Sequence, residues 1–188
     1  MAFLTQLWLP ILLSAVFVFV ASSVIHMALP IHKGDCKKLK NEDAVLDALR
    51  AQSIEPGMYM FPCAGSMKEM HTPEMVAKLE RGPVGRLTIQ AAGGFHLGRS
   101  LVWWFIFCLI VGLLAAYVGW HGLGAGAAYR TVFRVTGTAA ILGYAVGHLH
   151  DSIWNGVRWG TTAKFVLDGV IYGLVTAGTF GWLWPAAA

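Results

Sequence analysis

The chain has 188 residues, of which 56% are hydrophobic and only 13% are charged, and its formal net charge at pH 7 is +4. Soluble globular domains average about 25% charged residues, so half that share, together with long apolar runs, excludes an ordinary soluble fold. Collagen, a coiled coil and a disulfide scaffold are excluded as well, because there is no Gly-X-Y or heptad period and only three cysteines occur. The composition predicts an integral membrane protein.

Four stretches are long and apolar enough to cross the hydrocarbon layer, which is about 30 Å thick and takes about 20 helical residues. They run near Leu7–Ile25, Leu101–Val118, Val132–His148 and Phe165–Trp184. We therefore predict a membrane α-helical fold with four transmembrane helices and a small α+β insertion between the first two. The expected boundaries are 1–29 for the first helix, 30–100 for the insertion and 101–188 for the second to fourth helices.

The lysines and arginines predict the orientation. Ten of them lie between Pro30 and Ser100, and Arg158 and Lys164 are expected on the same side, whereas only Arg130 and Arg134 are expected opposite. Because positive charge stays on the cytoplasmic face, we expect residues 30–100 in the cytoplasm and both termini on the other side.

The insertion reads as two helices and two strands. Asn41 is a good N-cap for an amphipathic helix over 42–52, and Thr72 with Pro73 opens a second helix over 73–81. Residues 58–62 and 85–90 are typical of strands. The insertion also carries thioether, thiol and imidazole side chains that would suit copper(I). Methionine more often fills gaps in a hydrophobic core, and we favour that interpretation. The residues are Met58, Met60, Cys63, Met67, Met70, His71 and Met75.

Small residues recur at four-residue spacing in two expected spans. They are Ala139, Gly143 and Gly147 in the third span, and Gly169, Gly173, Ala177 and Gly181 in the fourth. In lipid, helices associate through close packing over such faces. The stripes predict packing of the third helix on the fourth, with a contact between copies of the chain as the alternative.

Polar side chains in the spans are candidates for function, because placing them in lipid is costly. Four are expected there: Arg134, His148, Asp168 and Tyr172. Imidazoles and carboxylates also gather where the spans end on the insertion side. They are His26, His32, His148, His150, Asp151 and Asp168.

This group raises the question of a metal or haem site. Imidazole and carboxylate ligands suit zinc, iron or copper, and helix bundles build such sites from facing helices. The candidate ligands are His26, His148, His150, Asp151 and Asp168. The spacing is unfavourable, since His148 and His150 point to different sides of a helix and no HxxxH pair occurs. The alternative is simple pairing of Asp168 with His148 or Lys164.

No GxSxG, Walker A, HExxH or dinucleotide-binding motif occurs, so no catalytic residue is assigned. The basic residues are not interleaved with aromatic ones, which argues against nucleic acid as a partner. The segments IHMALPIHKGD, NEDAVLDALRAQ, YMFPCAGSM and TVFRVTGTAAILGYAVGHL resemble those of small bacterial integral membrane proteins with no assigned activity. This resemblance transfers no functional residue and favours a bacterial inner membrane. With the orientation expected from the charges, both termini would then be periplasmic.

From the sequence we expect a non-catalytic structural or accessory membrane protein without a cofactor, which self-associates or joins other membrane subunits in the lipid bilayer. The first alternative is a protein that binds a transition metal or haem at the His/Asp group. The second is a small oligomer that conducts ions or protons through Asp168 and His148.

Overall fold

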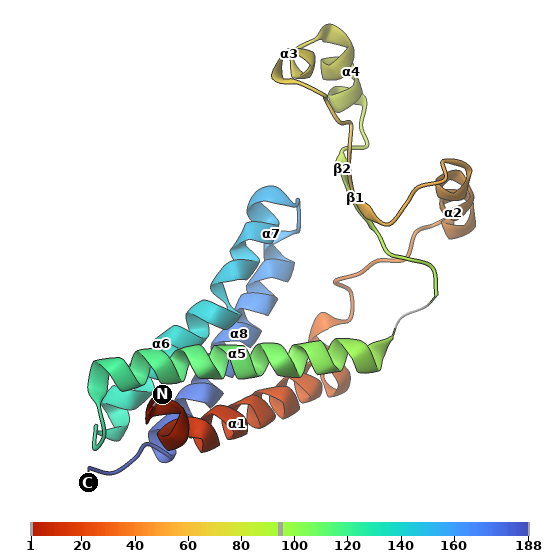
Figure 1. Cartoon of the computed structure of the whole chain (residues 1–188). Coiled ribbons are helices and arrows are strands. Elements are labelled where there is room, and N and C mark those ends of the chain that lie inside the picture. The colour runs from red at the N-terminus through yellow and green to blue at the C-terminus, as the bar shows by residue number, and fades with distance from the viewer. Residues whose placement is uncertain (1, 94–95, 188) are drawn as a thin grey trace. The chain divides into compact units, whose positions relative to one another are not determined.

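The computed structural model describes residues 2–93 and 96–187 and is mostly helical (Figure 1). The chain divides into two units, which are described separately. Met1–Asp35, His96–Ile153 and Val157–Ala188 form a helical unit, and Cys36–Phe95 with Trp154–Gly156 form a smaller α+β unit.

Among the residues that the structure describes, the helical unit contains three helices that are long and apolar enough to cross a membrane: Phe3–Ala28, Leu97–Leu123 and Trp159–Trp182. Among the described residues it contains eight helical elements, and the α+β unit is inserted in the chain between the third and the fourth. They are α1 (Ala2–Ser23), η1 (Val24–Ala28), η2 (Pro30–His32), α5 (Leu97–Leu123), α6 (Tyr129–Tyr144), η3 (Val146–His148), α7 (Leu149–Trp154) and α8 (Trp159–Trp182).

The stretch expected as the third span is interrupted. Helix α6 has 16 residues, which at 1.5 Å per residue is about 24 Å, less than the roughly 30 Å of the hydrocarbon layer. At Ala145 the α-helix ends, and the 3-10 turn η3 leads into α7. The helix expected over 132–148 therefore ends at Tyr144, and a fourth membrane-spanning helix is not confirmed among the described residues.

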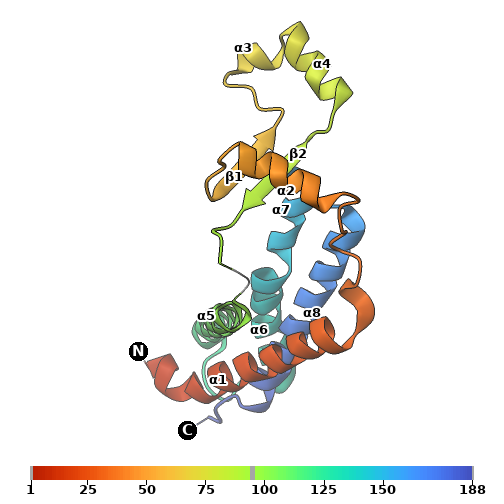
Figure 2. The ribbon, with the colours of Figure 1, turned by 90° about the vertical axis from the view of Figure 1, so that its right-hand side faces the viewer.

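The long helices pack in pairs within this unit. Helix α1 lies beside α5, and α6 lies beside α8 (Figure 1). Figure 2 views α5 end-on and shows α6 and α8 from the side, so this second pair crosses α5 steeply. The far end of α8 packs near the start of α1, where Leu7 and Phe180 share one apolar cluster.

Close backbone contact between α6 and α8 depends on glycines of α8. A Cβ added at Gly169 would lie 2.7 Å from the Ala145 Cα, and one at Gly173 would lie 2.9 Å from the Ile141 nitrogen. A Cβ at Gly181 would meet the Tyr129 ring. The small-residue stripe of α8 therefore faces α6 within the same chain.

The stripe expected on α6 is placed differently. The α6 residue that meets Ala177 is Gly137, whereas Gly143 faces Val111 of α5. Gly147 has no atom within 4 Å of an added Cβ, and Ala139 packs on the apolar cluster that contains Leu7. The α6 residues that contact α8 are therefore offset by one or two positions from the stripe that four-residue spacing predicted.

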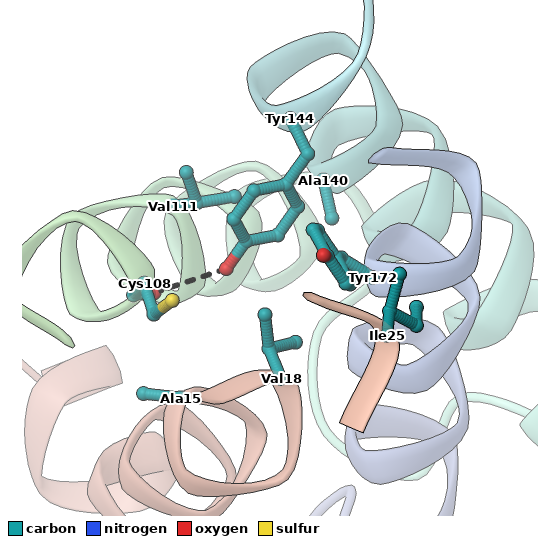
Figure 3. Close-up of a cluster of buried hydrophobic side chains, with 8 residues drawn as sticks. All are labelled: Ala15, Val18, Ile25, Cys108, Val111, Ala140, Tyr144 and Tyr172. Carbon is teal, nitrogen blue, oxygen red and sulfur yellow. Dashed lines mark hydrogen bonds between the residues drawn. The ribbon is translucent and has the colours of Figure 1, made fainter. Parts of the chain in front are cut away.

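A buried cluster joins the four long helices (Figure 3). Tyr144 of α6 and Tyr172 of α8 meet edge to face, with ring centroids 5.7 Å apart. The Tyr144 hydroxyl donates a hydrogen bond to the Cys108 carbonyl of α5 at 3.4 Å. Ala15 and Val18 complete the cluster from α1. This packing holds α6 and α8 against the first helix pair.

The smaller unit contains the elements expected there and one more. Asn41 caps α2 through Ala44, and Thr72 caps α4 through Met75. The two strands are antiparallel, with Gly57 opposite Ile89. The elements are α2 (Glu42–Ala51), β1 (Gly57–Phe61), α3 (Met67–Met70), α4 (Pro73–Arg81) and β2 (Gly85–Ile89). The two helices and two strands are confirmed to within a residue or two, and only the short α3 was not expected.

The methionines of this unit do not form the core we expected. Met75 is buried at 4% exposure, but Met58 and Met67 are 73% and 74% exposed. The unit is too small to bury both faces of a two-stranded sheet. The core interpretation therefore holds for Met75 and is wrong for the other four, since Met60 and Met70 are also exposed, at 49% and 37%.

Candidate functional site

The candidate site is built where the first helix ends. The last turn of this helix is a π-turn, η1, closed by a hydrogen bond from the Leu29 nitrogen to the Val24 carbonyl. Pro30 then opens the 3-10 turn η2, which reverses the chain. As a result the rings of His26 and His32 stack with centroids 4.4 Å apart and an interplanar angle of 5°. π-turns occur frequently at functional sites.

Hydrogen bonds fix which nitrogen of each imidazole carries the hydrogen. Nδ1 of His26 lies 3.2 Å from the Ser22 carbonyl, an acceptor, so that nitrogen must donate. Nδ1 of His32 lies 2.7 Å from Oδ2 of Asp35 and donates to it in the same way. In the neutral imidazoles both Nε2 atoms are therefore left with a lone pair.

Both Nε2 atoms face the carboxylate of Asp168 on α8. The His32 Nε2 lies 2.9 Å from Oδ2 of Asp168, and the His26 Nε2 lies 3.9 Å from the same oxygen. The His32 nitrogen is not aligned for a hydrogen bond, and among the described residues neither it nor Oδ2 of Asp168 has a hydrogen-bond partner. Asp168 is 3% exposed. Three lone-pair atoms thus converge within 4.8 Å of one another.

Lys164 supports this arrangement from one turn earlier on α8. Its ammonium group donates to Oδ1 of Asp35 at 2.7 Å and to the Ile31 carbonyl at 2.9 Å. The hydrogen bonds from Lys164 and then from His32 hold the pKa of Asp35 below its usual value. Asp35 is therefore an ionised acceptor at neutral pH, as the orientation of His32 requires. Lys164 pairs with Asp35. The alternative from the sequence, in which Lys164 pairs with Asp168, is therefore wrong.

The other predicted ligands lie elsewhere. His148 stacks on Phe165 with ring centroids 5.3 Å apart, and its Nδ1 is 3.9 Å from Oδ2 of Asp151. It does not join the three converging atoms, nor does Asp151. His150 and Arg134 are exposed. Of the five predicted metal ligands, the structure brings together His26 and Asp168.

Sequence reasoning placed His32 near this group but did not choose it as a ligand. The spacing of six residues between His26 and His32 matches no helical ligand pair, because a helix would turn the two rings to different faces. The signal that could have found it is Pro30 between them, since proline after an apolar span ends the helix and permits a reversal.

A cavity of about 500 Å³ adjoins the site, and His26 and Asp168 form part of its wall. His148 and Tyr172 also line it. Tyr172 is 4% exposed, and its hydroxyl has no hydrogen-bond partner among the described residues. Of the four polar candidates predicted for the spans, His148, Asp168 and Tyr172 therefore line the same cavity.

Compared with models of protein families, with curated proteins and with solved structures, the chain matches none.

Proposed function

We propose that this chain is a multi-pass membrane protein that binds a divalent transition-metal ion through Nε2 of His26, Nε2 of His32 and a carboxylate oxygen of Asp168. The convergence of these three lone-pair atoms, with no hydrogen directed between them, carries the proposal. A cation at their centre gives all three a partner and offsets the cost of leaving buried acceptors unpaired. The site joins the end of the first helix to the last one.

The donor set and its surroundings favour a first-row metal such as zinc or iron(II). Two imidazoles and one carboxylate are a common set for both ions and leave at least one coordination position open. In a tetrahedral site with bonds of about 2.1 Å, ligand atoms lie about 3.4 Å apart, which falls between the two distances to Oδ2 of Asp168. The Asp35–His32 hydrogen bond is the outer-sphere contact that ligating histidines usually make.

The ring geometry favours a bare ion over haem. Axial histidines of a haem approach the iron from opposite faces of the porphyrin. The rings of His26 and His32 are stacked and nearly parallel, and both of their Nε2 atoms face Asp168. They therefore do not approach one iron from opposite faces, and a tilt of one ring would bring both Nε2 lone pairs onto a single ion.

Four membrane crossings are part of the proposal, with the stretch from α6 through α7 as the interrupted one. Lys164 near the start of α8 binds the Ile31 carbonyl just after α1. Trp184, just past the end of α8, donates to the Gly124 carbonyl just after α5 at 2.9 Å. Because α5 returns the chain to the side where α1 starts, the segment between α5 and α8 must cross once more. The bacterial inner membrane and a cytoplasmic position for residues 30–100 belong to the same proposal.

One observation that supported the structural or accessory role expected from the sequence no longer supports it. It rested on small-residue stripes available for contact between copies, and the glycines of α8 are already covered by α6. Association with other subunits stays a prediction.

The test is metal content, measured by mass spectrometry on protein purified in mild detergent and loaded separately with Zn²⁺ or, without oxygen, Fe²⁺. We expect about one ion per chain in the wild type, and less than a tenth of that in His32→Gln and Asp168→Asn. His150→Gln is the matched control and should bind like the wild type. Wild-type protein that retains neither ion, or His32→Gln that retains as much as the wild type, would contradict the proposal.

A variant that has lost its fold would also lose metal, so each one is melted with and without metal. A ligand that binds only the folded state raises its stability. We expect Zn²⁺ or Fe²⁺ to raise the melting temperature of the wild type and of His150→Gln, and to leave a folded His32→Gln unchanged. A rise of equal size in folded His32→Gln would place the ion elsewhere.

A further inference from the structure

Four methionines of the α+β unit lie at its surface and have no part in its core. They are Met58, Met60, Met67 and Met70, and Met67 is the most exposed of them, at 74%. Burying methionine side chains stabilises a fold, so a small unit that leaves four of them in water forgoes stability. Their thioether sulfurs are instead accessible to an ion from solution.

The single helical turn α3 places three donor side chains on one face. The thioethers of Met67 and Met70 and the imidazole of His71 stand at positions i, i+3 and i+4, which are neighbours on a helical surface with Cβ atoms about 5–6 Å apart. His71 is the C-cap of α3 and continues the turn, since its nitrogen donates to the Lys68 carbonyl at 3.3 Å. All three donors are exposed, so two sulfurs and one ring nitrogen can reach the same ion.

Hydrogen bonds at both ends hold this turn in shape. At its start the Ser66 hydroxyl accepts from the Glu69 nitrogen at 3.2 Å, and the Glu69 carboxylate reaches back to accept from the Gly65 nitrogen at 2.6 Å. At its end the nitrogen and the hydroxyl of Thr72 both donate to the Glu69 carbonyl, at 3.0 and 2.9 Å. A single turn of helix is unstable by itself in water, and these bonds arrange the three donors before any ion binds.

The donor set is free and carries no negative charge. Among the described residues, none forms a hydrogen bond, ion pair or ring contact with the imidazole of His71. The carboxylate of Glu69 is directed back to the Gly65 nitrogen. Two thioethers and a neutral imidazole are therefore left as ligands, and thioether sulfur is a soft donor that favours copper(I).

We infer that α3 binds copper(I) through the sulfurs of Met67 and Met70 and a ring nitrogen of His71. The seven soft ligands that the sequence offered are thereby narrowed to the three that share one exposed helical face. Zinc and iron(II) are bound better by sites that include carboxylate or thiolate ligands. This inference goes beyond the metal site at Asp168 and does not depend on it.

The probe is Ag⁺, a soft monovalent ion that stands in for copper(I) and is stable in air. Thiols bind Ag⁺ themselves, so the full-length protein carries Cys36→Ser and Cys63→Ser, which replace its exposed cysteines. Met67→Leu and His71→Gln each remove one donor from this background. Met58→Leu is the matched control, because Met58 is 73% exposed, like Met67, but stands on the strand β1.

Binding is measured by isothermal titration in mild detergent. We expect about one Ag⁺ per chain in the background protein and in Met58→Leu, and an affinity weaker by about tenfold or more in Met67→Leu and His71→Gln, since each loses one of three donors. An equal concentration of Zn²⁺ should not displace the ion. Absence of binding in the background protein, equal affinity in Met67→Leu and Met58→Leu, or displacement by Zn²⁺ would overturn the inference.

Nuclear magnetic resonance of the methionine methyl groups identifies the ligands without relying on a variant that folds. In the background protein Ag⁺ should shift the methyl resonances of Met67 and Met70 and leave those of Met58 and the buried Met75 in place. A shift confined to Met58, or no shift at any methionine, would contradict the assignment.

Discussion

Nε2 of His32 lies 2.9 Å from Oδ2 of Asp168 although the two residues stand near opposite ends of the chain, one just after the first helix and one in the last. Neither atom makes a hydrogen bond with the other described residues. The contact therefore ties α8 to the turn after α1. When His32 is neutral both atoms carry lone pairs, which the proposed cation would share.

Loss of the Asp35 carboxylate should weaken metal binding without removing a ligand. Asp35 orients His32 through a 2.7 Å hydrogen bond, and loss of such an outer contact usually lowers metal affinity about 10- to 100-fold. We expect Asp35→Asn to show a loss of that size in a competition titration with a zinc-binding dye. Asp151→Asn, which changes a carboxylate outside the cluster, is the control. Affinity in Asp35→Asn equal to that of the control would show that His32 does not need Asp35.

The α6–α8 contact should be sensitive to single methyl groups. In Gly169→Ala the new Cβ would lie 2.7 Å from the backbone of Ala145, and backbone cannot move aside as a side chain can. We expect a destabilisation of about 1–3 kcal/mol, seen as a lower melting temperature in detergent. Gly178→Ala on the same helix has open space and should melt at or slightly above the wild-type temperature, since alanine favours helix. Equal melting of the two variants would mean that the helices are not in close contact.

Trp104 and Ser22 should be energetically coupled. The indole of α5 donates to the serine hydroxyl of α1 at 2.8 Å in a half-buried setting. Neutral hydrogen bonds contribute about 0.5–1.5 kcal/mol, so a double-mutant cycle with Trp104→Phe and Ser22→Ala should give a coupling free energy in that range. Unfolding in detergent supplies the four values. A cycle that closes with zero coupling would indicate that the bond does not form in the membrane protein.

The orientation is testable with the protein's own cysteines. Cys36 and Cys63 are exposed, and positive charge near the spans predicts that both are cytoplasmic. A membrane-impermeant maleimide should label them in opened membranes but not in intact spheroplasts. A cysteine placed at Ala125, in the connection between α5 and α6, should show the reverse. Labelling of Cys36 and Cys63 in intact cells would invert the topology.

Local features were predictable from the sequence, and long-range ones were not. Asn41 and Thr72 cap their helices as expected, because a cap involves only the next three residues. The contacts of Asp168 depend on a turn far away along the chain, so neither Lys164 nor His148 was the right partner. His32 was not predicted as a member of this group for the same reason, because the π-turn and the 3-10 turn that carry it back onto His26 have no periodic signature.

The small-residue stripes show a second limit. Four-residue spacing identified the face of α8 correctly in that Gly169 and Gly173 meet α6. On α6 the same rule chose Gly143, which faces α5, over Gly137, which meets Ala177. Helix α6 carries small residues on several of its faces, and only the positions of the neighbouring helices decide which face packs against α8.

X-ray absorption at the metal edge of the loaded protein tests the metal site itself, because it reports the ligands. We predict nitrogen and oxygen neighbours at about 2.0–2.2 Å and the outer-shell scattering of two imidazoles, reduced to one imidazole in His26→Gln or His32→Gln. A spectrum without imidazole scattering, or one that is identical in His32→Gln and the wild type, would contradict it.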